Sequence, residues 1–362
     1  MHVAVVGGGS GGHVTPVVAL LRYIEHDIEL REKCKEISRF GELDGQEYSA
    51  SLHFPRVTFV PITSGKWRRY DFWKTLLPNL LDMVFVIKGF FVALFELRKR
   101  KVTVVFCKWS HVAVPVCMAA GILGIPVVLH ESDIYPWLAN RIIAKRATIK
   151  FAWFPNVFGP DTQVSGQLLS SALLHFDQTE LWKWLSSNET TNVLVMGGSQ
   201  WSTVIYETLA NILTDEWTQE YHFYVILWKR NEHLAERFAP FSQVTTFPYL
   251  TVEEVASLCA HCDLSITRGG VTSLAEQQLF GLKKAIVPLP FTWGNHQEYN
   301  ARWYVEKYGD ACLLQDASLQ QHMADFLDRY RHFKKEQVLP DTKQLQEAPH
   351  MIWQTLVQLW NT

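Results

Sequence analysis

The stretch VAVVGGGSGGHVTPVVALLRY, residues 3–23, decides the fold. A β-branched run leads through Gly7-Gly8-Gly9-Ser10-Gly11-Gly12-His13 into a helical pattern over residues 16–23. In such a turn, backbone amides and the positive end of the helix can approach an anion closely, so the loop predicts phosphate binding. A tight turn without a ligand is the structural alternative.

Gly7, Gly9 and Gly12 also satisfy the dinucleotide pattern G-x-G-x-x-G, which is weak by itself. That interpretation needs an acidic residue at the end of a second strand, and residues 25–36 instead look like the polar tail of a helix.

Short apolar runs alternate with helical patterns along the whole chain. The predicted strands are residues 3–6, 57–59, 102–106, 127–130, 193–196, 223–227, 264–267 and 285–289. This alternation predicts an α/β fold with two Rossmann-like, doubly wound parallel sheets and an interdomain cleft. We expect an N-terminal domain at 1–160, a C-terminal domain at 161–345, and a helix at 346–362 that packs back on the N-terminal domain.

The composition is that of a folded protein without a strong charge. Of the 362 residues, 48% are hydrophobic and 19% charged, and the net charge is −2, which excludes disorder and a global attraction to nucleic acid. Six scattered cysteines argue against a disulfide framework and indicate a reducing compartment. Cys259 and Cys262 have metal-ligand spacing but no partner pair, so we expect buried helix cysteines, no metal and no cofactor.

The sequence predicts neither a targeting signal nor a membrane span, although one segment imitates a span. The N-terminus has no basic region followed by a long apolar core, so no signal peptide is predicted there. Residues 109–130 carry no Asp, Glu, Lys or Arg, but Gly121, Gly124 and Pro126 divide them into a helix at 114–122 and a strand at 127–129. We interpret them as protein core.

Two further glycine turns follow predicted strands in the second half. Gly197-Gly198-Ser199-Gln200 is the counterpart of the first loop, and Arg268-Gly269-Gly270 opens a helical pattern in which Glu276 could accept both hydroxyls of a ribose. His296 and Gln297 stand at another helix start, where they could meet sugar hydroxyls; capping by Asn295 is the alternative.

The motifs together resemble a known family. GGGSGGH at 7–13, ITSGKWRRY at 62–70, GIPVVLHESD at 124–133, LVMGGSQ at 194–200, and RGGVTSLAEQ with PLPFTWGNHQEYNA at 268–301 are similar, in order and spacing, to the MurG-type N-acetylglucosaminyltransferases of peptidoglycan synthesis. The resemblance implies a GT-B fold and an inverting transfer of N-acetylglucosamine from UDP-N-acetylglucosamine to the 4-hydroxyl of lipid-linked N-acetylmuramyl-pentapeptide.

The resemblance and the motifs assign residues to roles. His13 is the expected general base and Asp133 the second candidate, whose structural alternative is a helix cap. The acceptor is expected to contact Gly9, Lys108, Trp109, Ser110 and His111. The expected UDP-N-acetylglucosamine site consists of Ser10, Gly11, Gly12, Gly198, Ser199, Gln200, Val271, Thr272, Ser273, Glu276, His296 and Gln297. No Asp-x-Asp motif is present to hold a metal, so helix N-termini should stabilise the departing diphosphate.

Three places depart from the family pattern. Family members usually have Gly-Gly where Trp109-Ser110 stand, Gly-Ala where Trp201-Ser202 stand, and Gly-Asn-Pro with a following Arg where Gly166-Gln167-Leu168 stand. These departures keep two alternatives open, a transferase with another lipid acceptor, such as a diacylglycerol, and a non-catalytic UDP-sugar-binding paralogue. A nicotinamide or flavin oxidoreductase is a third, resting on the G-x-G-x-x-G match.

The segment 66–101 predicts a membrane-binding face at the cytoplasmic surface of the membrane. It holds nine basic and three acidic residues, interleaved with aromatic and leucine side chains, in a chain of net charge −2. Aromatic residues beside basic ones anchor proteins at anionic lipid headgroups. We expect residues 67–81 to contact the membrane and residues 90–97 to form a solvated helix face over ordinary core.

Overall fold

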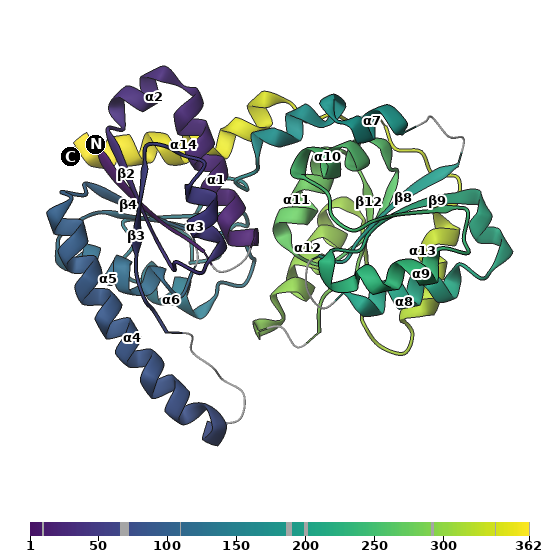
Figure 1. Cartoon of the computed structure of the whole chain (residues 1–362), viewed down its shortest axis with the longest axis horizontal. Coiled ribbons are helices and arrows are strands. Elements are labelled where there is room, and N and C mark those ends of the chain that lie inside the picture. Colours follow the sequence, from purple (N-terminus) through teal and green to yellow (C-terminus); the bar gives the residue numbers. More distant parts are fainter. Residues whose placement is uncertain are drawn as a thin grey trace. The chain divides into compact units, whose positions relative to one another are not determined.

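Each half of the chain folds around its own parallel β-sheet (Figure 1). The computed structural model describes residues 1–8, 11–65, 72–108, 110–185, 190–198, 202–290, 293–336 and 338–361, and only the backbone of residues 11–13, 46, 72–75 and 293. Unit 1 comprises Met1–Ser170 and Lys343–Thr362, and unit 2 comprises Ser171–Thr342.

Unit 1 contains a sheet with the strand order β3-β2-β1-β4-β5-β6-β7. Its strands are β1 His2–Val6, β2 Glu36–Gly41, β3 Val57–Pro61, β4 Val104–Lys108, β5 Val127–Glu131, β6 Ile149–Ala152 and β7 Gln163–Val164. Its helices are α1 Gly11–His26, α2 Ile28–Lys33, α3 Gln46–Ser51, α4 Phe72–Lys99, α5 Ala113–Ile122, α6 Leu138–Ala144 and α14 Thr342–Asn361. The order changes direction between β1 and β4, and such a switch point places a crevice at the carboxyl ends of the strands.

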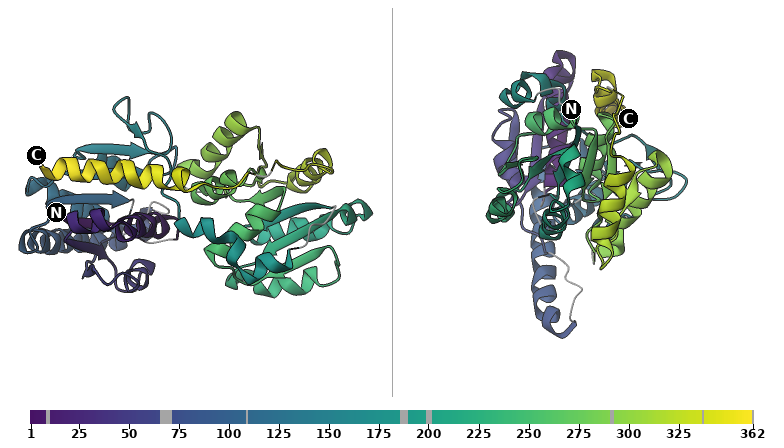
Figure 2. Two further views of the ribbon diagram at one scale, coloured as in Figure 1. Left: turned by 90° about the horizontal axis from the view of Figure 1, so that it is seen from above. Right: turned by 90° about the vertical axis from the view of Figure 1, so that its right-hand side faces the viewer.

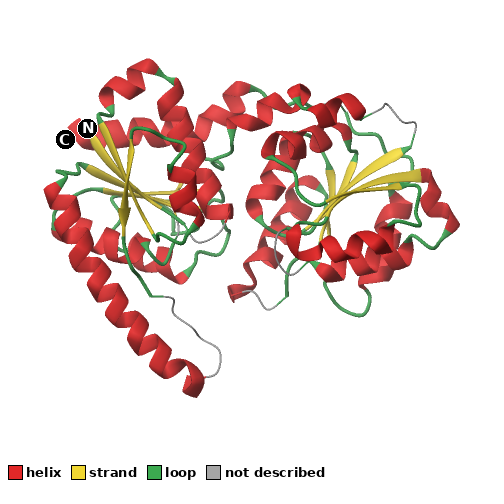
Figure 3. Cartoon of the chain, in the orientation of Figure 1, coloured by secondary structure: helices red, strands yellow, loops and turns green. Residues whose placement is uncertain are grey.

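Both faces of the unit 1 sheet are covered by helices (Figure 3). On one face, Val3 and Val5 of β1 pack with α1 and with Ile352 and Leu356 of α14. On the other face, Ala4 and the α5 residues pack with α4 and α6. Two-sided burial explains why the central strands are continuous apolar runs.

Unit 2 contains a sheet with the strand order β10-β9-β8-β11-β12-β13. Its strands are β8 Thr191–Met196, β9 Tyr221–Ile226, β10 Val244–Phe247, β11 Leu264–Thr267, β12 Lys283–Ile286 and β13 Ala311–Cys312. Its α-helices are α7 Glu180–Trp184, α8 Thr203–Ile212, α9 Ala235–Phe238, α10 Val252–His261, α11 Val271–Leu279, α12 His296–Tyr308 and α13 Leu319–Arg329. Short 3₁₀ helices span η1 Ser171–Gln178, η2 Glu216–Glu220, η3 Lys229–Leu234 and η4 Trp293–Asn295.

The sequence prediction of two parallel-sheet domains is confirmed, with corrections to individual elements. The polar stretch 25–36 is not a helix tail, because α2 ends at Lys33 and β2 begins at Glu36. Strands β2, β6, β7, β10 and β13 were not predicted. The chain leaves unit 1 after Ser170, later than residue 160, because β7 still pairs with β6 and Leu168 belongs to the unit 1 core.

Local signals explain other boundaries. Thr251 and Glu254 form a reciprocal capping box that starts α10. Gly124, with φ of +70°, follows the end of α5, so the uncharged segment 109–130 contains a buried helix and a strand as predicted. Cys259 in α10 and Cys262 just after it are both buried. Among the described helices, none is long and apolar enough to cross a membrane.

Candidate functional site

The glycine turn after β8 is hydrogen-bonded to buried groups of unit 2. The Gly197 N–H donates to the Tyr206 hydroxyl at 3.1 Å, which donates to the carbonyl of Ile226 at 2.6 Å. Gly198 has φ of +78°, which favours glycine, and open space where a side chain would lie. The turn therefore presents backbone at the end of β8, as a phosphate-binding loop requires. Ser199 and Gln200 lie outside the described residues.

Ser202, one of the departures from the family pattern, supports this turn. Its buried hydroxyl donates to the Gly198 carbonyl at 3.1 Å and accepts from Asn231 Nδ2 at 3.1 Å. Thr203 Oγ1 donates to Asn231 Oδ1 at 2.9 Å. Asn231 was not predicted as a site residue, because nothing in its local pattern indicates a contact with a segment 29 residues away. Trp201 lies outside the described residues.

The second site element of unit 2 is the start of α11. Gly269 must be glycine, because a side-chain carbon there would lie 2.4 Å from the Gln297 carbonyl oxygen. Gly270, in open space, precedes Val271, Thr272 and Ser273, whose N–H groups form the positive end of the helix. This end can stabilise a diphosphate without a metal.

Glu276 lies on α11, half-buried, with no hydrogen-bond partner for its carboxylate among the described residues. Burial raises the pKa of Glu276 to about 7. A ligand with two hydroxyl donors would satisfy the carboxylate and favour its charged form.

His296 and Gln297 are the first residues of α12, beside the Gly269 turn. His296 is buried, and Gln297 Oε1 accepts from the Leu289 N–H at 3.0 Å, which fixes that side chain and leaves its NH₂ group as a donor. The alternative of capping by Asn295 is wrong: Asn295 is left-handed, with φ of 49°, and makes no side-chain cap. The structure thus brings the turn before α11 against the start of α12, at Gly269 and Gln297.

The first glycine loop lies against β4 in unit 1. A side-chain carbon on Gly7 would come within 2.4 Å of the Lys108 carbonyl oxygen, so the close approach requires glycine. Gly11, Gly12 and His13 form the first turn of α1, of which the structure describes the backbone alone. Gly9 and Ser10 lie outside the described residues.

The predicted acceptor residues after β4 are held by hydrogen bonds within unit 1. His111 Nε2 lies 3.1 Å from Glu42 Oε1, and the His111 carbonyl accepts from Ser64 Oγ at 3.0 Å. Ser110 Oγ accepts from the Val112 N–H at 3.2 Å. These bonds join the loops after β2, β3 and β4 at one edge of the sheet. Trp109 lies outside the described residues.

Asp133 follows β5 at the same edge. Its Oδ2 accepts from Trp137 Nε1 at 2.9 Å, and its N–H donates to Glu131 Oε1 at 3.0 Å. Asp133 does not cap the backbone of α6, whose N-cap residue is Trp137. The aspartate is buried, with one oxygen engaged by an indole N–H.

Helix α4 carries an exposed apolar stripe. Its first half extends beyond the other elements of unit 1 (Figures 1 and 2). The exposed apolar side chains are Leu76, Leu77, Leu80, Leu81, Met83, Val84, Phe85, Ile87, Phe91 and Phe95. The expectation of a solvated helix face over core at residues 90–97 is confirmed: Phe91 and Phe95 are 61% and 63% exposed, whereas Ala93 and Leu97 are buried. Residues 66–71 lie outside the described residues, as do the side chains of 72–75.

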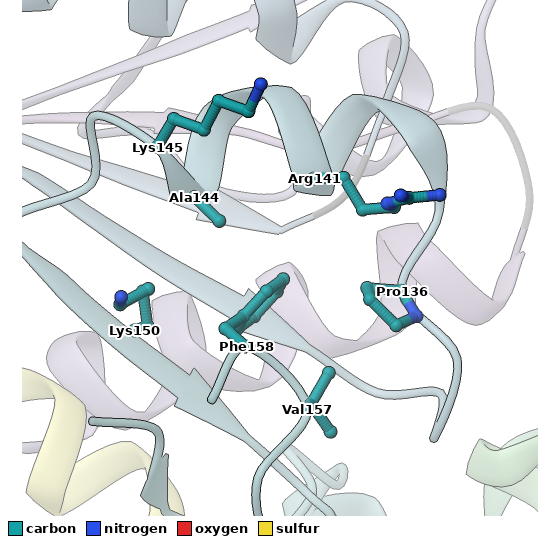
Figure 4. Close-up of a pocket in the computed structure, with 7 residues that line it drawn as sticks. All are labelled: Pro136, Arg141, Ala144, Lys145, Lys150, Val157 and Phe158. Carbon is teal, nitrogen blue, oxygen red and sulfur yellow. The ribbon is translucent and has the colours of Figure 1, made fainter. Parts of the chain in front are cut away.

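A basic hollow of about 430 Å³ lies in unit 1 (Figure 4). Arg141 of α6, Lys145 after it and Lys150 of β6 line it, together with Pro136, Ala144, Val157 and Phe158. Lys150 pairs with Asp161. Phe158 packs against the core cluster that contains α4 and α5, so the hollow belongs to the α4 face of the sheet.

Two parallel-sheet units, each with a glycine turn after its first strand and a helix N-terminus beside it, define the GT-B class of glycosyltransferases. Solved structures share the fold. MurG of Acinetobacter baumannii matches with a TM-score of 0.69 at 21% identity over 99% of both chains. The UDP-GlcNAc 2-epimerase of Neisseria meningitidis, bound to UDP-GlcNAc, matches with a TM-score of 0.64 at 12% identity over 99% of this chain and all of that one.

Sequence comparison places the chain within that class. Residues 3–151 match the glycosyltransferase family 28 N-terminal domain and residues 192–354 match the family 28 C-terminal domain. A Clostridium kluyveri enzyme is 34% identical over 80% of this chain and 79% of its own, and one from Clostridium perfringens is 32% identical over 89% and 87%. Both are named UDP-N-acetylglucosamine–N-acetylmuramyl-(pentapeptide) pyrophosphoryl-undecaprenol N-acetylglucosamine transferase.

The chain belongs to this family of UDP-N-acetylglucosamine-dependent glycosyltransferases. The resemblance found in the sequence motifs is thereby confirmed. Family membership also rules out the oxidoreductase interpretation of Gly7, Gly9 and Gly12.

Proposed function

We propose that the chain transfers N-acetylglucosamine from UDP-N-acetylglucosamine to the 4-hydroxyl of a polyprenyl-diphosphate-linked N-acetylmuramyl-pentapeptide, with inversion, at the cytoplasmic membrane surface. The observation that carries the donor half is the close approach of the Gly269 turn, at the N-terminus of α11, to Gln297 at the start of α12, together with the half-buried Glu276 carboxylate farther along α11. Oxygen O4 of the acceptor attacks the anomeric carbon as the bond to the UDP oxygen breaks.

In unit 2, Glu276 accepts the two ribose hydroxyls of UDP, and Ser273 with the α11 amides binds its diphosphate. The charge that develops on the departing UDP is stabilised by the positive end of α11 and by the turn at Gly198. His296 and Gln297 donate to the hydroxyls of the sugar. The N-terminus of α11 and the turn at Gly198 directly follow β11 and β8, at the carboxyl edge of the sheet, where ligands bind in parallel α/β folds.

In unit 1, the base takes the proton of the acceptor hydroxyl. His13 is our first candidate because an imidazole can both accept and release a proton near neutral pH, and because its backbone lies in the first turn of α1, after β1, at the same sheet edge as the acceptor loop. Asp133, which lies just past β5 at the same edge, is the second candidate. It ranks behind His13 because one of its oxygens accepts a hydrogen bond from Trp137, which makes the carboxylate less basic. The glycine loop and residues 109–111 contact the acceptor.

The α4 face binds the anionic membrane surface that carries the acceptor. The leucine stripe over residues 76–81 supplies insertion, and Phe91 and Phe95 extend it. Exposed Lys88, Arg98 and Lys99 on the same helix supply attraction to anionic lipids. The basic hollow at Arg141 and Lys145 adds positive charge on the same face of the sheet.

The test is a UDP-release assay that crosses several UDP-sugars with polyprenyl-diphosphate and glycerolipid acceptors in vesicles. We expect release only with UDP-N-acetylglucosamine and the lipid-linked muramyl-pentapeptide. Release with diacylglycerol would make it a glycerolipid transferase. Binding of UDP-N-acetylglucosamine without release for any acceptor would make it a non-catalytic paralogue. Glu306→Gln, an exposed carboxylate of the same unit, is the matched control for variants of Glu276.

A further inference from the structure

Lys108, at the end of β4, is buried to 1% exposure although it was predicted to bind the acceptor. Its ammonium contacts His130 Nδ1 at 3.0 Å and the hydroxyl of Ser132. At this exposure an acceptor phosphate has no access to the ammonium group. Lys108 must therefore act, if it acts at all, through its neighbours.

Two hydrogen-bonded arms run from Lys108 to the same turn. An ammonium group only donates, so His130 Nδ1 accepts and His130 Nε2 carries the hydrogen that it donates to the Gly166 carbonyl at 3.0 Å. In the other arm, Ser132 Oγ accepts from Lys108 and donates to Gln167 Oε1 at 2.7 Å. Gly166 has φ of +86°, and the chain passes into unit 2 shortly afterwards, at Ser171.

A carboxylate holds the other side of the same cluster. Glu131 Oε1 accepts from the N–H groups of Ser132 and Asp133 at 2.7 and 3.0 Å, and its Oε2 accepts from Asn140 Nδ2 at 2.8 Å. The backbone that carries Asp133 is thus fixed both by the bonds of the Ser132 side chain to Lys108 and Gln167 and by the bonds of the Ser132 and Asp133 N–H groups to Glu131. Two of the three departures from the family pattern lie close to Lys108. Residues 109–110 follow it directly in the sequence, and Gln167 of the departure at 167–168 is hydrogen-bonded to its partner Ser132.

We propose that Lys108 is a positioning residue whose charged ammonium joins the ends of β4 and β5 to the 166–167 turn and so sets the acceptor edge of unit 1. The inference rests on the proposed function, because it assigns the acceptor to this edge. Loss of the charge removes the donor to both arms, frees Ser132 and His130, and displaces Asp133 together with Ser110 and His111.

The charges around Lys108 give the proposal a pH signature. The titratable groups that face it are the neutral His130 and Glu131 of β5, Asp133 after β5, and Cys107 of β4, which contacts Cys117 of α5. Burial lowers the pKa of Lys108 to about 8, against the opposing effect of Glu131 and Asp133. Burial also raises the pKa of Glu131 to about 7. The positioning network should weaken as the ammonium loses its proton.

The experiment compares the full-length wild type with Lys108→Met, which keeps the chain length and removes the charge. UDP-N-acetylglucosamine affinity is measured by calorimetry, and kcat and KM for a lipid-linked muramyl-pentapeptide from about pH 6 to pH 10. Lys284→Met is the control, since Lys284 in unit 2 is equally buried and pairs with Asp310 at 3.1 Å.

We expect Lys108→Met to lower kcat/KM for the acceptor by about ten-fold or more, with donor affinity within about two-fold of wild type. The wild type should lose kcat/KM as the pH rises through about 8, and the variant should lack that alkaline limb. Lys284→Met should lower thermal stability and keep the limb.

An unchanged kcat/KM in Lys108→Met, or an alkaline limb that persists in this variant, overturns the inference. The proposed function is tested separately by the wild type: it stands if the wild type releases UDP with this acceptor. If Lys108→Met does not fold, Gln167→Leu removes the acceptor of the Ser132 arm and leaves the His130 arm in place. It should lower acceptor kcat/KM without changing donor affinity, and wild-type kinetics for Gln167→Leu would refute the positioning role.

Discussion

Replacing Glu276 by glutamine should stabilise unit 2 and weaken UDP binding in the same protein. Burial raises the Glu276 pKa from 4.5 to about 7, with no opposing hydrogen bond. Below about pH 4.5 the group is protonated in folded and unfolded chains and contributes nothing. As the pH rises from 4.5 to 7, the unfolded chain ionises first, so folding stability falls, and above about 7 the folded state bears the full cost of a buried charge. The shift corresponds to about 3 kcal/mol, which the partial exposure of the side chain reduces to about 1–2 kcal/mol.

The assay is thermal unfolding of wild type, Glu276→Gln and the Glu306→Gln control at pH 5 and pH 8, with UDP calorimetry at pH 8. We expect Glu276→Gln to melt about 2–8 °C higher at pH 8 and little higher at pH 5, and to bind UDP about ten-fold or more weakly. Wild type should release protons when it binds UDP near pH 7, because ribose hydroxyls favour the carboxylate. A lower melting temperature at pH 8 would refute the burial argument, and unchanged UDP affinity would remove Glu276 from the donor site.

Three further outcomes test the other parts of the site. His13→Ala should reduce turnover by about 10²–10⁴-fold and spare UDP affinity, measured by UDP release and calorimetry; wild-type turnover would transfer the role of base to Asp133 or water. Changing Leu77, Val84 and Phe91, which are 67%, 60% and 61% exposed, to serine removes about 1–2 kcal/mol of insertion each. Sedimentation with anionic vesicles should fall about a hundred-fold or more at unchanged melting temperature, whereas a large loss of stability would show that the stripe is core. Replacing Trp109-Ser110 by Gly-Gly should change the acceptor KM and leave UDP-N-acetylglucosamine binding alone; an altered donor affinity would contradict the assignment of this loop to the acceptor.

The central strands were predictable because burial on both faces makes them continuous apolar runs. The strand β2 was not, because its sequence EISRFG contains Ser38 and Arg39, both fully buried. A buried arginine in a strand breaks the apolar pattern on which the prediction depends. Three of the edge strands were not predicted for a different reason. Strand β10 is half-buried along its length, and β7 and β13 have only two residues each.

The donor site was predictable for a local reason. A strand, a glycine turn and a helix start are contiguous in sequence, so Gly269, Gly270 and Glu276 could be placed relative to one another before the fold was known. The partners of Lys108 could not be predicted from the sequence. His130, Ser132 and Gln167 meet it only because β4 and β5 are neighbours in the sheet and the turn after β7 returns to their ends.

The departures from the family pattern argue for a working enzyme with an altered acceptor edge. A site that decays without selection accumulates buried polar groups without partners, because each lost contact leaves its counterpart unsatisfied. Here the polar substituted residues within the described chain are themselves hydrogen-bonded: Ser202 supports the Gly198 turn, Ser110 bonds the Val112 N–H, and Gln167 accepts from Ser132. Two of these three contacts lie at the acceptor edge of unit 1, whereas the Glu276 and Gln297 constellation of unit 2 keeps the family pattern. We therefore expect ordinary donor affinity combined with a distinct acceptor KM.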